Sequence, residues 1–454
     1  MKTLYYKSAF LTFCFFITLS VQSQLKTLYN ISPISGFVFD TSDSSALLRK
    51  NIKIDIAVLN AFNNDSFKIF LPSQTNPRGI PVTLIKQRQS INNSSNILSW
   101  YGKIQGQAGS LVLFTNLGSA VAGYIRDKDN KIYRIQYRGN DFHQIAAINS
   151  LFIKTDKIFA PQNLIAENVI PDNEIVHSNC CDTSNEIDIL VVYTTEAKDS
   201  AHGTDAIKTI IELCINISNV SYENSGINQK IILVHTDEVD YTEHAIADTY
   251  LSDLIHPSGG RLENVHNLRN TYKADIVVMV VYNMAGYEGI SNIMTSNSVA
   301  FEDSAFCVVR LDHAFDHKVF THELGHIMGA GHQCIEGTYG LYENSRGFIG
   351  NNFNTIMSVN YQFGRIEHFS NPNVFYPGPG GVLTGTSSGL CLSNNAFTLN
   401  KTIAVVNKFR CRGEVNCSLT ENSWIGSTCF WLILILISLI LFFLFWYLFR
   451  RNRR

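Results

Sequence analysis

The chain has 454 residues, enough for two or three domains, and its 45% hydrophobic and 16% charged content excludes a globally disordered protein. Its 36 Lys and Arg residues nearly balance 38 Asp and Glu residues, and a net charge of −2 gives no support for nucleic acid as a partner. Strongly apolar runs at both ends argue against a simple cytosolic protein.

Residues 1–23 have the pattern of a secretory signal peptide. Lys2 and Lys7 form its basic start, residues 9–19 form a short apolar stretch, and Val21 and Ser23 stand at the usual distances before a cleavage site. An uncleaved membrane anchor is the alternative. We therefore expect the body of the protein to be exported.

Residues 24–183 are predicted to form a β-rich domain followed by a linker. Short apolar stretches alternate there with turn residues, as in successive strands. The expected strands are 53–59, 66–71, 79–85, 97–104, 110–114, 120–125 and 132–137. His143 stands alone, which favours a structural or surface role, and residues 151–184 have the composition of a connector.

Residues 184–412 have the pattern of an α/β layer fold, with a sheet covered by helices. Apolar runs at 186–193, 230–235, 274–282 and 304–310 predict strands, and most of these strands read as buried. Residues 205–220 place apolar side chains at helical spacing, and 251–272 are expected to be helical in part.

The sequence THELGHIMGAGH at residues 321–332 carries the chemistry. His322 and His326 are four residues apart, so a helix places both imidazoles on one face, with Glu323 beside them. Gly329 is suited to end that helix and turn the chain so that His332 supplies a third nitrogen. Three histidines and one water make the open form of a zinc site, which activates water and polarises a carbonyl, as peptide hydrolysis requires.

Residues 413–454 contain a long apolar segment followed by a basic tail. After a juxtamembrane stretch at 413–428, residues 429–449 contain no charged side chain and are long enough to cross a membrane as one helix. Residues 450–454 are rich in Arg, so the positive-inside rule predicts a cytoplasmic tail and an external body. The alternative is a sorting tail that is later removed, which would release the protein.

The motif resembles that of the metzincin metallopeptidases. Their second mark is a methionine turn, and NTIMSVNY supplies Met357, 25 residues after the third histidine. The segment from His368 and residues 394–410 resemble reprolysin-like members. Residues 187–194 and 99–114 are similar to secreted microbial reprolysin-like enzymes, including the peptidyl-Asp metalloendopeptidase group.

The resemblance implies a metzincin catalytic domain at 184–412, with a mixed twisted sheet, an active-site helix and a methionine turn. It implies that the β-rich region at 24–183 is a prodomain that assists folding or inhibits the enzyme by blocking its cleft. The site residues that it implies are His322, His326 and His332 as ligands of one Zn²⁺, Glu323 as the general base and Met357 as the floor of the site. A role for Ca²⁺ stays open, and the expected partners are protein or peptide substrates, not nucleic acid.

Two positions depart from the family pattern. Gln333 stands where many reprolysins have an Asp that supports the loop after the third histidine, so the geometry of this loop is open. Val359 stands where other metzincins have Tyr. Arg365, beyond the methionine turn, is a candidate for selecting acidic substrates, although an exposed structural arginine is the expectation. We expect His313 and His317 to lie on the surface or to cap a helix, not to bind metal.

The sequence therefore predicts an exported zinc endopeptidase, with two alternatives. One is an inactive adhesion or binding protein on a metallopeptidase scaffold. The other is a thermolysin-like site with a distant Glu as third ligand, which His332 makes unnecessary. The eight cysteines outside the two apolar ends suit disulfides, although Cys180 or Cys181 is a candidate thiolate cap on the metal.

Overall fold

The structure is a computed structural model of the chain. It describes residues 25–29, 46–61, 65–92, 94–149, 157–159, 185–258, 262–334, 340–360, 362–378 and 381–412. Within these residues, no helix is long and apolar enough to cross a membrane. The predicted signal peptide, the predicted span at 429–449, the basic tail, and Cys180 and Cys181 lie outside the described residues.

The N-terminal region forms an eight-stranded antiparallel sheet in the order β1-β8-β7-β6-β5-β4-β3-β2. Its strands are β1 (Ala46–Lys53), β2 (Ser66–Leu71), β3 (Ile80–Asn92), β4 (Ile97–Ile104), β5 (Leu111–Leu117), β6 (Ala120–Arg126), β7 (Ile132–Tyr137) and β8 (Phe142–Ile148). The predicted β-rich character is confirmed. The predicted strand at 53–59 is wrong, because the Asp55 side chain accepts a hydrogen bond from Ala57 N and starts the short helix α1 (Ile56–Asn60).

The second half of the chain forms a six-stranded mixed sheet in the order β11-β10-β12-β14-β13-β9. Its strands are β9 (Lys157–Phe159), β10 (Glu186–Thr194), β11 (Lys230–Val239), β12 (Ile276–Val281), β13 (Gly289–Asn292) and β14 (Phe306–Arg310), and a small hairpin comprises β15 (Phe375–Tyr376) and β16 (Val382–Leu383). Four strands run parallel, as their continuous apolar runs predict, and β13 runs antiparallel to β14. The predicted sheet with helices is confirmed.

Helices cover the second sheet and complete its core. They are α2 (Thr195–Ser200), α3 (Thr204–Asn224), α4 (Ala247–Ile255), α5 (Glu263–Tyr272), α6 (Val319–Ile327) and α7 (Asn395–Val406), with short 3-10 helices at Val299–Ser304 and Leu311–His313. The predicted helix at 205–220 is α3, and α4 and α5 account for the predicted partial helix at 251–272.

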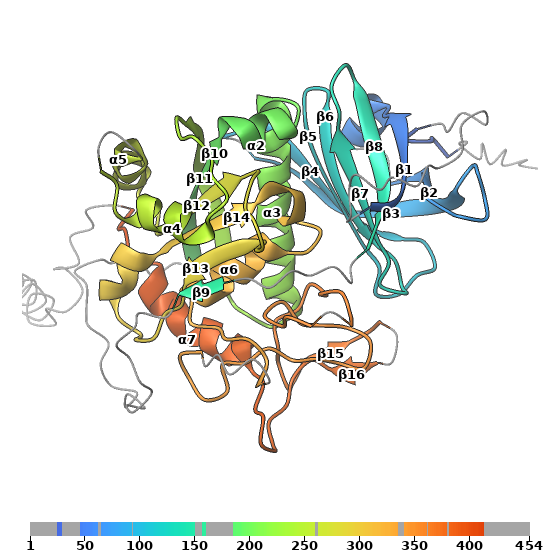
Figure 1. Cartoon of the computed structure of the whole chain (residues 1–454). Helices are drawn as coiled ribbons and strands as arrows, with labels where there is room; N and C mark the ends of the chain where they lie inside the picture. Colours follow the sequence, from blue (N-terminus) through green and yellow to red (C-terminus); the bar gives the residue numbers. More distant parts are fainter. Residues whose placement is uncertain are drawn as a thin grey trace, which may run out of the picture.

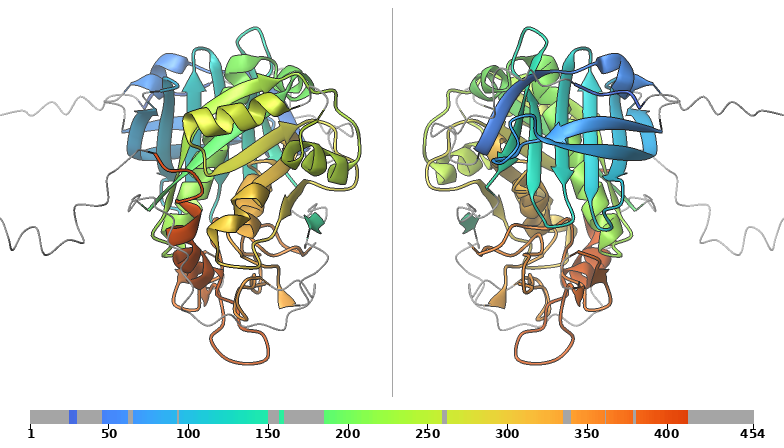
Figure 2. Two further views of the ribbon diagram at one scale, coloured as in Figure 1. Left: turned by 90° about the vertical axis from the view of Figure 1, so that its left-hand side faces the viewer. Right: turned by 90° about the vertical axis from the view of Figure 1, so that its right-hand side faces the viewer.

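Helix α3 stands between the two sheets (Figure 1). Tyr101 donates a hydrogen bond to the Asn216 side chain, and the Asn216 amide donates to Ser99 Oγ at 2.8 Å. Apolar side chains of β5, β6 and β7 join those of α3 and the second sheet in one hydrophobic cluster. The two sheets therefore share a core through α3, and two further views show the N-terminal sheet against the rest of the chain (Figure 2).

Buried ion pairs also join the N-terminal sheet to the segments that flank α6. Arg126 Nε lies 2.8 Å from Glu367 Oε2, and Lys318 Nζ, just before α6, lies 3.3 Å from Glu367 Oε1. Arg134 Nη1 lies 2.9 Å from Asp316 Oδ2. All of these side chains are at least 96% buried, so the charges depend on one another for compensation.

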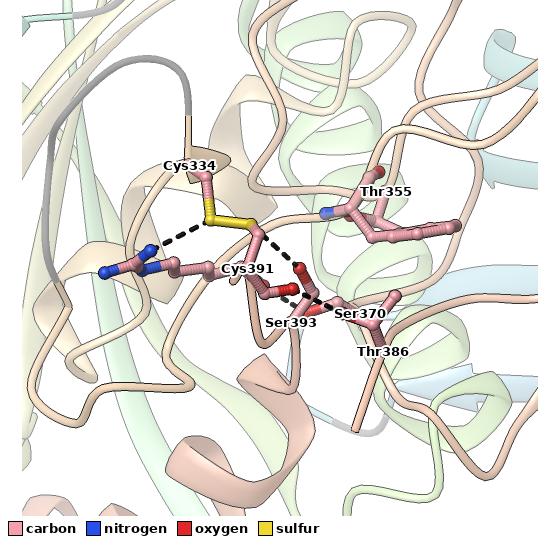
Figure 3. Close-up of a disulfide and its surroundings, with 8 residues drawn as sticks. Cys334, Thr355, Ser370, Thr386, Cys391 and Ser393 are labelled. Carbon is pink, nitrogen blue, oxygen red and sulfur yellow. Dashed lines mark hydrogen bonds between the residues drawn. A yellow bond between two sulfur atoms is a disulfide. The ribbon is translucent and has the colours of Figure 1, made fainter. Parts of the chain in front are cut away.

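The cysteines follow the predicted pattern only in part. Cys334 and Cys391 form a disulfide beside the loop that contains Thr355, with the Arg346 guanidinium against Cys334 Sγ (Figure 3). Cys214 and Cys307 are buried and not disulfide-bonded, so the expectation of disulfides does not hold for these two. Both lie inside the hydrophobic core, where each packs as a small apolar side chain.

Candidate metal centre

Helix α6 brings the three predicted histidines together. His322 and His326 lie one turn apart on the same face, and their Nε2 atoms are 3.0 Å apart. The helix ends at Ile327, and Gly329 adopts φ +87°, the left-handed conformation predicted for the turn. That turn returns the chain so that His332 Nε2 lies 3.1 Å from both other Nε2 atoms.

Backbone carbonyls fix the orientation of two of these rings. His322 Nδ1 donates to the Ile356 carbonyl at 2.7 Å, and His326 Nδ1 donates to the Ala330 carbonyl at 2.9 Å. With Nδ1 carrying the proton in each neutral ring, both Nε2 atoms point a lone pair into the centre of the cluster. Such carbonyl partners are typical of histidines that bind metal.

The donor set fits a metal ion. Facing lone pairs repel one another, and a cation among them removes that repulsion. Bonds of about 2.0–2.1 Å from zinc to nitrogen in a tetrahedral site place the nitrogens about 3.3 Å apart, close to the separations of 3.0–3.1 Å in this cluster. His322, His326 and His332 are all buried and form a group able to hold one ion.

Glu323 lies beside the histidine cluster under strand β13. Its Oε2 atom accepts a hydrogen bond from Ser291 Oγ at 2.5 Å, and the carboxylate is fully buried. Gly289, at the start of β13, faces the same carboxylate so closely that a side chain at this position would collide with it. Strand β13 therefore lies directly against the predicted general base.

The loop that contains Met357 lies beneath α6. Gly325 faces the Met357 thioether so closely that a Cβ there would overlap its sulfur atom. Gln333 then joins this loop to the turn after His332, because its Nε2 donates to the Val359 carbonyl and its Oε1 accepts from Val359 N, both at 2.8 Å. Gln333 thus holds the loop that contains Met357 against the turn after His332, although this residue departs from the family pattern.

The surface positions expected for three side chains near the site are wrong. His313 and His317 are 5% and 2% exposed, and Arg365 is 3% exposed, so none of them lies on the surface. Arg365 is buried because its Nε and Nη1 donate to the carbonyls of Ser358 and His317. His313 and His317 stack on each other with ring centroids 4.3 Å apart and form a second buried group with Glu288.

The region that contains this site matches a known protein family. Residues 183–370 match the model of Reprolysin_5, metallo-peptidase family M12. This region is a reprolysin-like metallopeptidase domain. The match spans α6, all three histidines and Met357.

Curated relatives extend the likeness beyond that domain. A peptidyl-Asp metalloendopeptidase of Stenotrophomonas maltophilia is 28% identical over 318 residues, 67% of this chain and 72% of the relative. One from Xanthomonas campestris is 26% identical over 68% of this chain and 75% of the relative. One from Pseudomonas aeruginosa is 30% identical over 41% of this chain and 35% of the relative. The chain is thus similar to metallopeptidases over about two thirds of its length.

A solved structure, "Structure of a chaperone-substrate complex", covers 50% of this chain and 39% of that chain, with a TM-score of 0.40 at 20% identity. A likeness at this level does not establish a shared fold.

Sequence reasoning missed β13, Ser291 and Glu288. Strand β13 has only four residues, of which one is a large apolar residue, so no alternation marks it. Its position against Glu323 follows from antiparallel pairing with β14. No local signal in the sequence identifies Ser291 or Glu288 as neighbours of the metallopeptidase motif.

Proposed function

We propose that the chain is a zinc-dependent endopeptidase in which His322, His326 and His332 hold one Zn²⁺ and Glu323 is the general base. The observation that carries this proposal is the convergence of three buried Nε2 atoms within 3.0–3.1 Å of one another. The adjacent buried carboxylate of Glu323 distinguishes the cluster from a purely structural metal site.

Each residue of the site has a distinct role in the proposed hydrolysis. A bound zinc ion supplies Lewis acidity toward a peptide carbonyl and toward water. Glu323 takes a proton from the attacking water and delivers it to the departing amine. Ser291 holds the Glu323 carboxylate through its hydroxyl, and Met357 supports α6 from below.

We propose that cleavage occurs beside aspartate. The support is the similarity to two peptidyl-Asp metalloendopeptidases, which extends over about two thirds of this chain. The same relatives favour an enzyme over an inactive adhesion protein on a metallopeptidase scaffold. A distant carboxylate as third metal ligand is not needed, because His332 already completes the cluster.

Metal removal tests the proposal. We expect the purified full-length chain, before or after limited proteolysis, to cleave an Asp-containing peptide at a rate that a chelator reduces to the uncatalysed level. One equivalent of Zn²⁺ should restore the rate, because the three histidines supply the site for the ion. Cleavage that continues at the same rate in metal-free protein would contradict the proposal.

We propose domain limits of 24–183 for the prodomain and linker and 184–412 for the catalytic domain, with inhibition by the linker. Strand β9 pairs in parallel with β13, Ser291 opposite Ile158, and Figure 1 shows the two side by side. A substrate that adds a strand to the edge of β13, next to Glu323, needs the edge that β9 occupies.

Replacing residues 157–159 with Gly-Ser-Gly tests this inhibition. Because glycine and serine weaken the strand pairing, we expect the uncleaved variant to hydrolyse peptides several-fold faster than the uncleaved wild type. Proteolysed wild-type protein gives the upper limit of activity. Equal rates for the uncleaved variant and the uncleaved wild type would show that β9 does not inhibit.

Export, with a single C-terminal membrane anchor, is also part of the proposal and rests on the sequences of residues 1–23 and 429–449. Digestion of intact cells by an added protease tests it, since an exported catalytic domain is cut and an internal one is protected.

A further inference from the structure

The central strand β6 of the N-terminal sheet is buried on both faces. All seven of its residues are buried, although successive side chains of a strand point to opposite faces of the sheet. Val121 and Ile125 pack into a core within the N-terminal region, whereas Tyr124 packs into the cluster that contains α3 and the second sheet. An antiparallel sheet commonly leaves one face in water. In this chain the second half covers that face.

Helix α3 is covered on opposite sides in the same way. Fifteen of its 21 residues are buried, and it contacts β4, β5 and β6 as well as β11 and α6 (Figure 1). Two of its polar groups are also paired across the contact. The Glu212 side chain accepts from Asn92 Nδ2 at 3.1 Å, and the Thr209 carbonyl accepts from Thr115 Oγ1 at 2.8 Å. The contact therefore resembles a domain core cut in half, as in permanent complexes.

The N-terminal sheet also holds the start of the active-site helix α6. Lys318 directly precedes this helix and has φ +60°, a left-handed conformation that persists in a residue other than glycine only where its surroundings hold it. Lys318 Nζ lies 4.9 Å from the centre of the Tyr124 ring. Arg134 of β7 pairs with Asp316 at 2.9 Å and donates to the Asp312 carbonyl at 3.3 Å. The sheet thus fixes the segment that leads into the histidine cluster.

The proposed inhibitory contact belongs to a different part of the N-terminal region. Strand β9 occupies the edge of β13, whereas the contact with α3 and the start of α6 is made by the eight-stranded sheet. That sheet ends at Ile148, and β9 begins at Lys157. Displacement of β9 from β13 therefore does not require the sheet to leave.

We propose that the N-terminal sheet, residues 46–148, stays bound to the second half of the chain after the linker is cut, as a permanent part of the active enzyme. Its departure would expose to water the apolar face of the sheet and the side of α3 that it covers. It would also remove Tyr124 and Arg134 from the start of α6. The statement about activity rests on the proposed function, whereas the retention of the sheet does not.

A specific cut in the linker tests this inference. A protease recognition sequence is placed at residues 161–170 of the full-length chain that carries Gly-Ser-Gly at 157–159, and the cut protein is immobilised through its C-terminal end. We expect the N-terminal fragment to stay bound in buffer and the cut protein to cleave peptides. Removing the fragment with urea, and then removing the urea, should lower kcat/KM by about 100-fold, because the start of α6 loses its support. Added fragment should restore the rate.

Arg134→Gln and Arg88→Gln form a matched pair of variants. Each arginine lies in the N-terminal sheet and pairs with a carboxylate of the second half, but Arg134 is buried and Arg88 is half-exposed. We expect Arg134→Gln to speed the loss of the cut fragment by about 30-fold or more, the usual effect of truncating a buried charge pair. Arg88→Gln should change this rate by less than about fivefold.

Three results would separate this inference from the proposed function. A fragment that washes away at once in buffer, or a second half that keeps its full kcat/KM without the fragment, overturns the inference. Peptide hydrolysis that begins only when the fragment is removed also overturns it, since the sheet would then be an inhibitor. A cut protein that retains the fragment but cleaves no peptide, with or without it, contradicts the proposed function and not the retention of the sheet.

Discussion

Glu323→Gln is expected to lower kcat for peptide hydrolysis by about 10²- to 10⁴-fold, the usual contribution of a general acid–base residue. The amide keeps the shape of the carboxylate but cannot accept the proton of the attacking water. The Ser291 hydroxyl can still donate a hydrogen bond to the amide oxygen, so the local fold should survive. The loss should therefore appear in kcat and not in the folded fraction.

Steady-state kinetics with an Asp-containing peptide measure this effect, and far-ultraviolet circular dichroism checks the fold. Glu238→Gln is the matched control, because Glu238 lies on β11, is partly exposed, and accepts its side-chain hydrogen bonds from Thr195 and Lys198. The control should retain wild-type kcat. A Glu323→Gln variant that keeps full activity would remove Glu323 from the mechanism.

Glu367→Gln is expected to reduce the free energy of unfolding by about 3–5 kcal/mol, the usual effect of removing one partner from a buried ion pair. The change leaves Arg126 and Lys318 as buried cations without a carboxylate, at the contact between the N-terminal sheet and α6. The Tyr124 hydroxyl also loses its charged acceptor. Urea denaturation monitored by fluorescence measures the loss.

Glu223→Gln is the control for this variant. Glu223 lies on α3 and pairs with Arg88 of the N-terminal sheet across the same interface, at 3.3 Å, but is 66% exposed. Exposed pairs contribute about 0–1 kcal/mol, so the control should unfold almost as the wild type does. Equal losses of unfolding free energy from Glu367→Gln and Glu223→Gln would show that burial does not determine how much these ion pairs stabilise the fold.

The same network predicts how stability depends on pH. Burial raises the pKa of Glu367, but the charges of Arg126 and Lys318 outweigh burial and lower the pKa to about 2. The stabilising contribution of this carboxylate is therefore complete above its unfolded pKa of about 4.5 and is lost as the pH falls toward 2. Glu367→Gln should remove this part of the acid sensitivity.

Local sequence patterns predicted much of the fold. The strands at 66–71, 97–104 and 132–137 have the predicted limits, because alternating side chains between turn residues determine both ends of such strands. The strand predicted at 53–59 failed because a single capping side chain, that of Asp55, outweighed the apolar pattern. Patterns of apolar residues do not report such competing local hydrogen bonds.

In the candidate site, local sequence patterns likewise predict some residues, whereas the tertiary fold alone positions the others. His322, His326 and His332 come together through a helix and a turn, and both of these local elements are predicted by the sequence. Ser291 and Glu288 reach the site only through the pairing of β13 with β14, which depends on the tertiary fold. Arg365 was expected at the surface, because the backbone carbonyls that satisfy its guanidinium cannot be read from the sequence.

Zinc content and peptide hydrolysis, measured on the same preparations of the wild type and Glu323→Gln, test the proposed metal centre most directly. We expect one zinc ion per chain in both proteins, because His322, His326 and His332 are unchanged, and hydrolysis in the wild type alone. If both proteins hold one zinc ion and neither cleaves a peptide, even after limited proteolysis, the chain is a binding scaffold and the peptidase account is wrong.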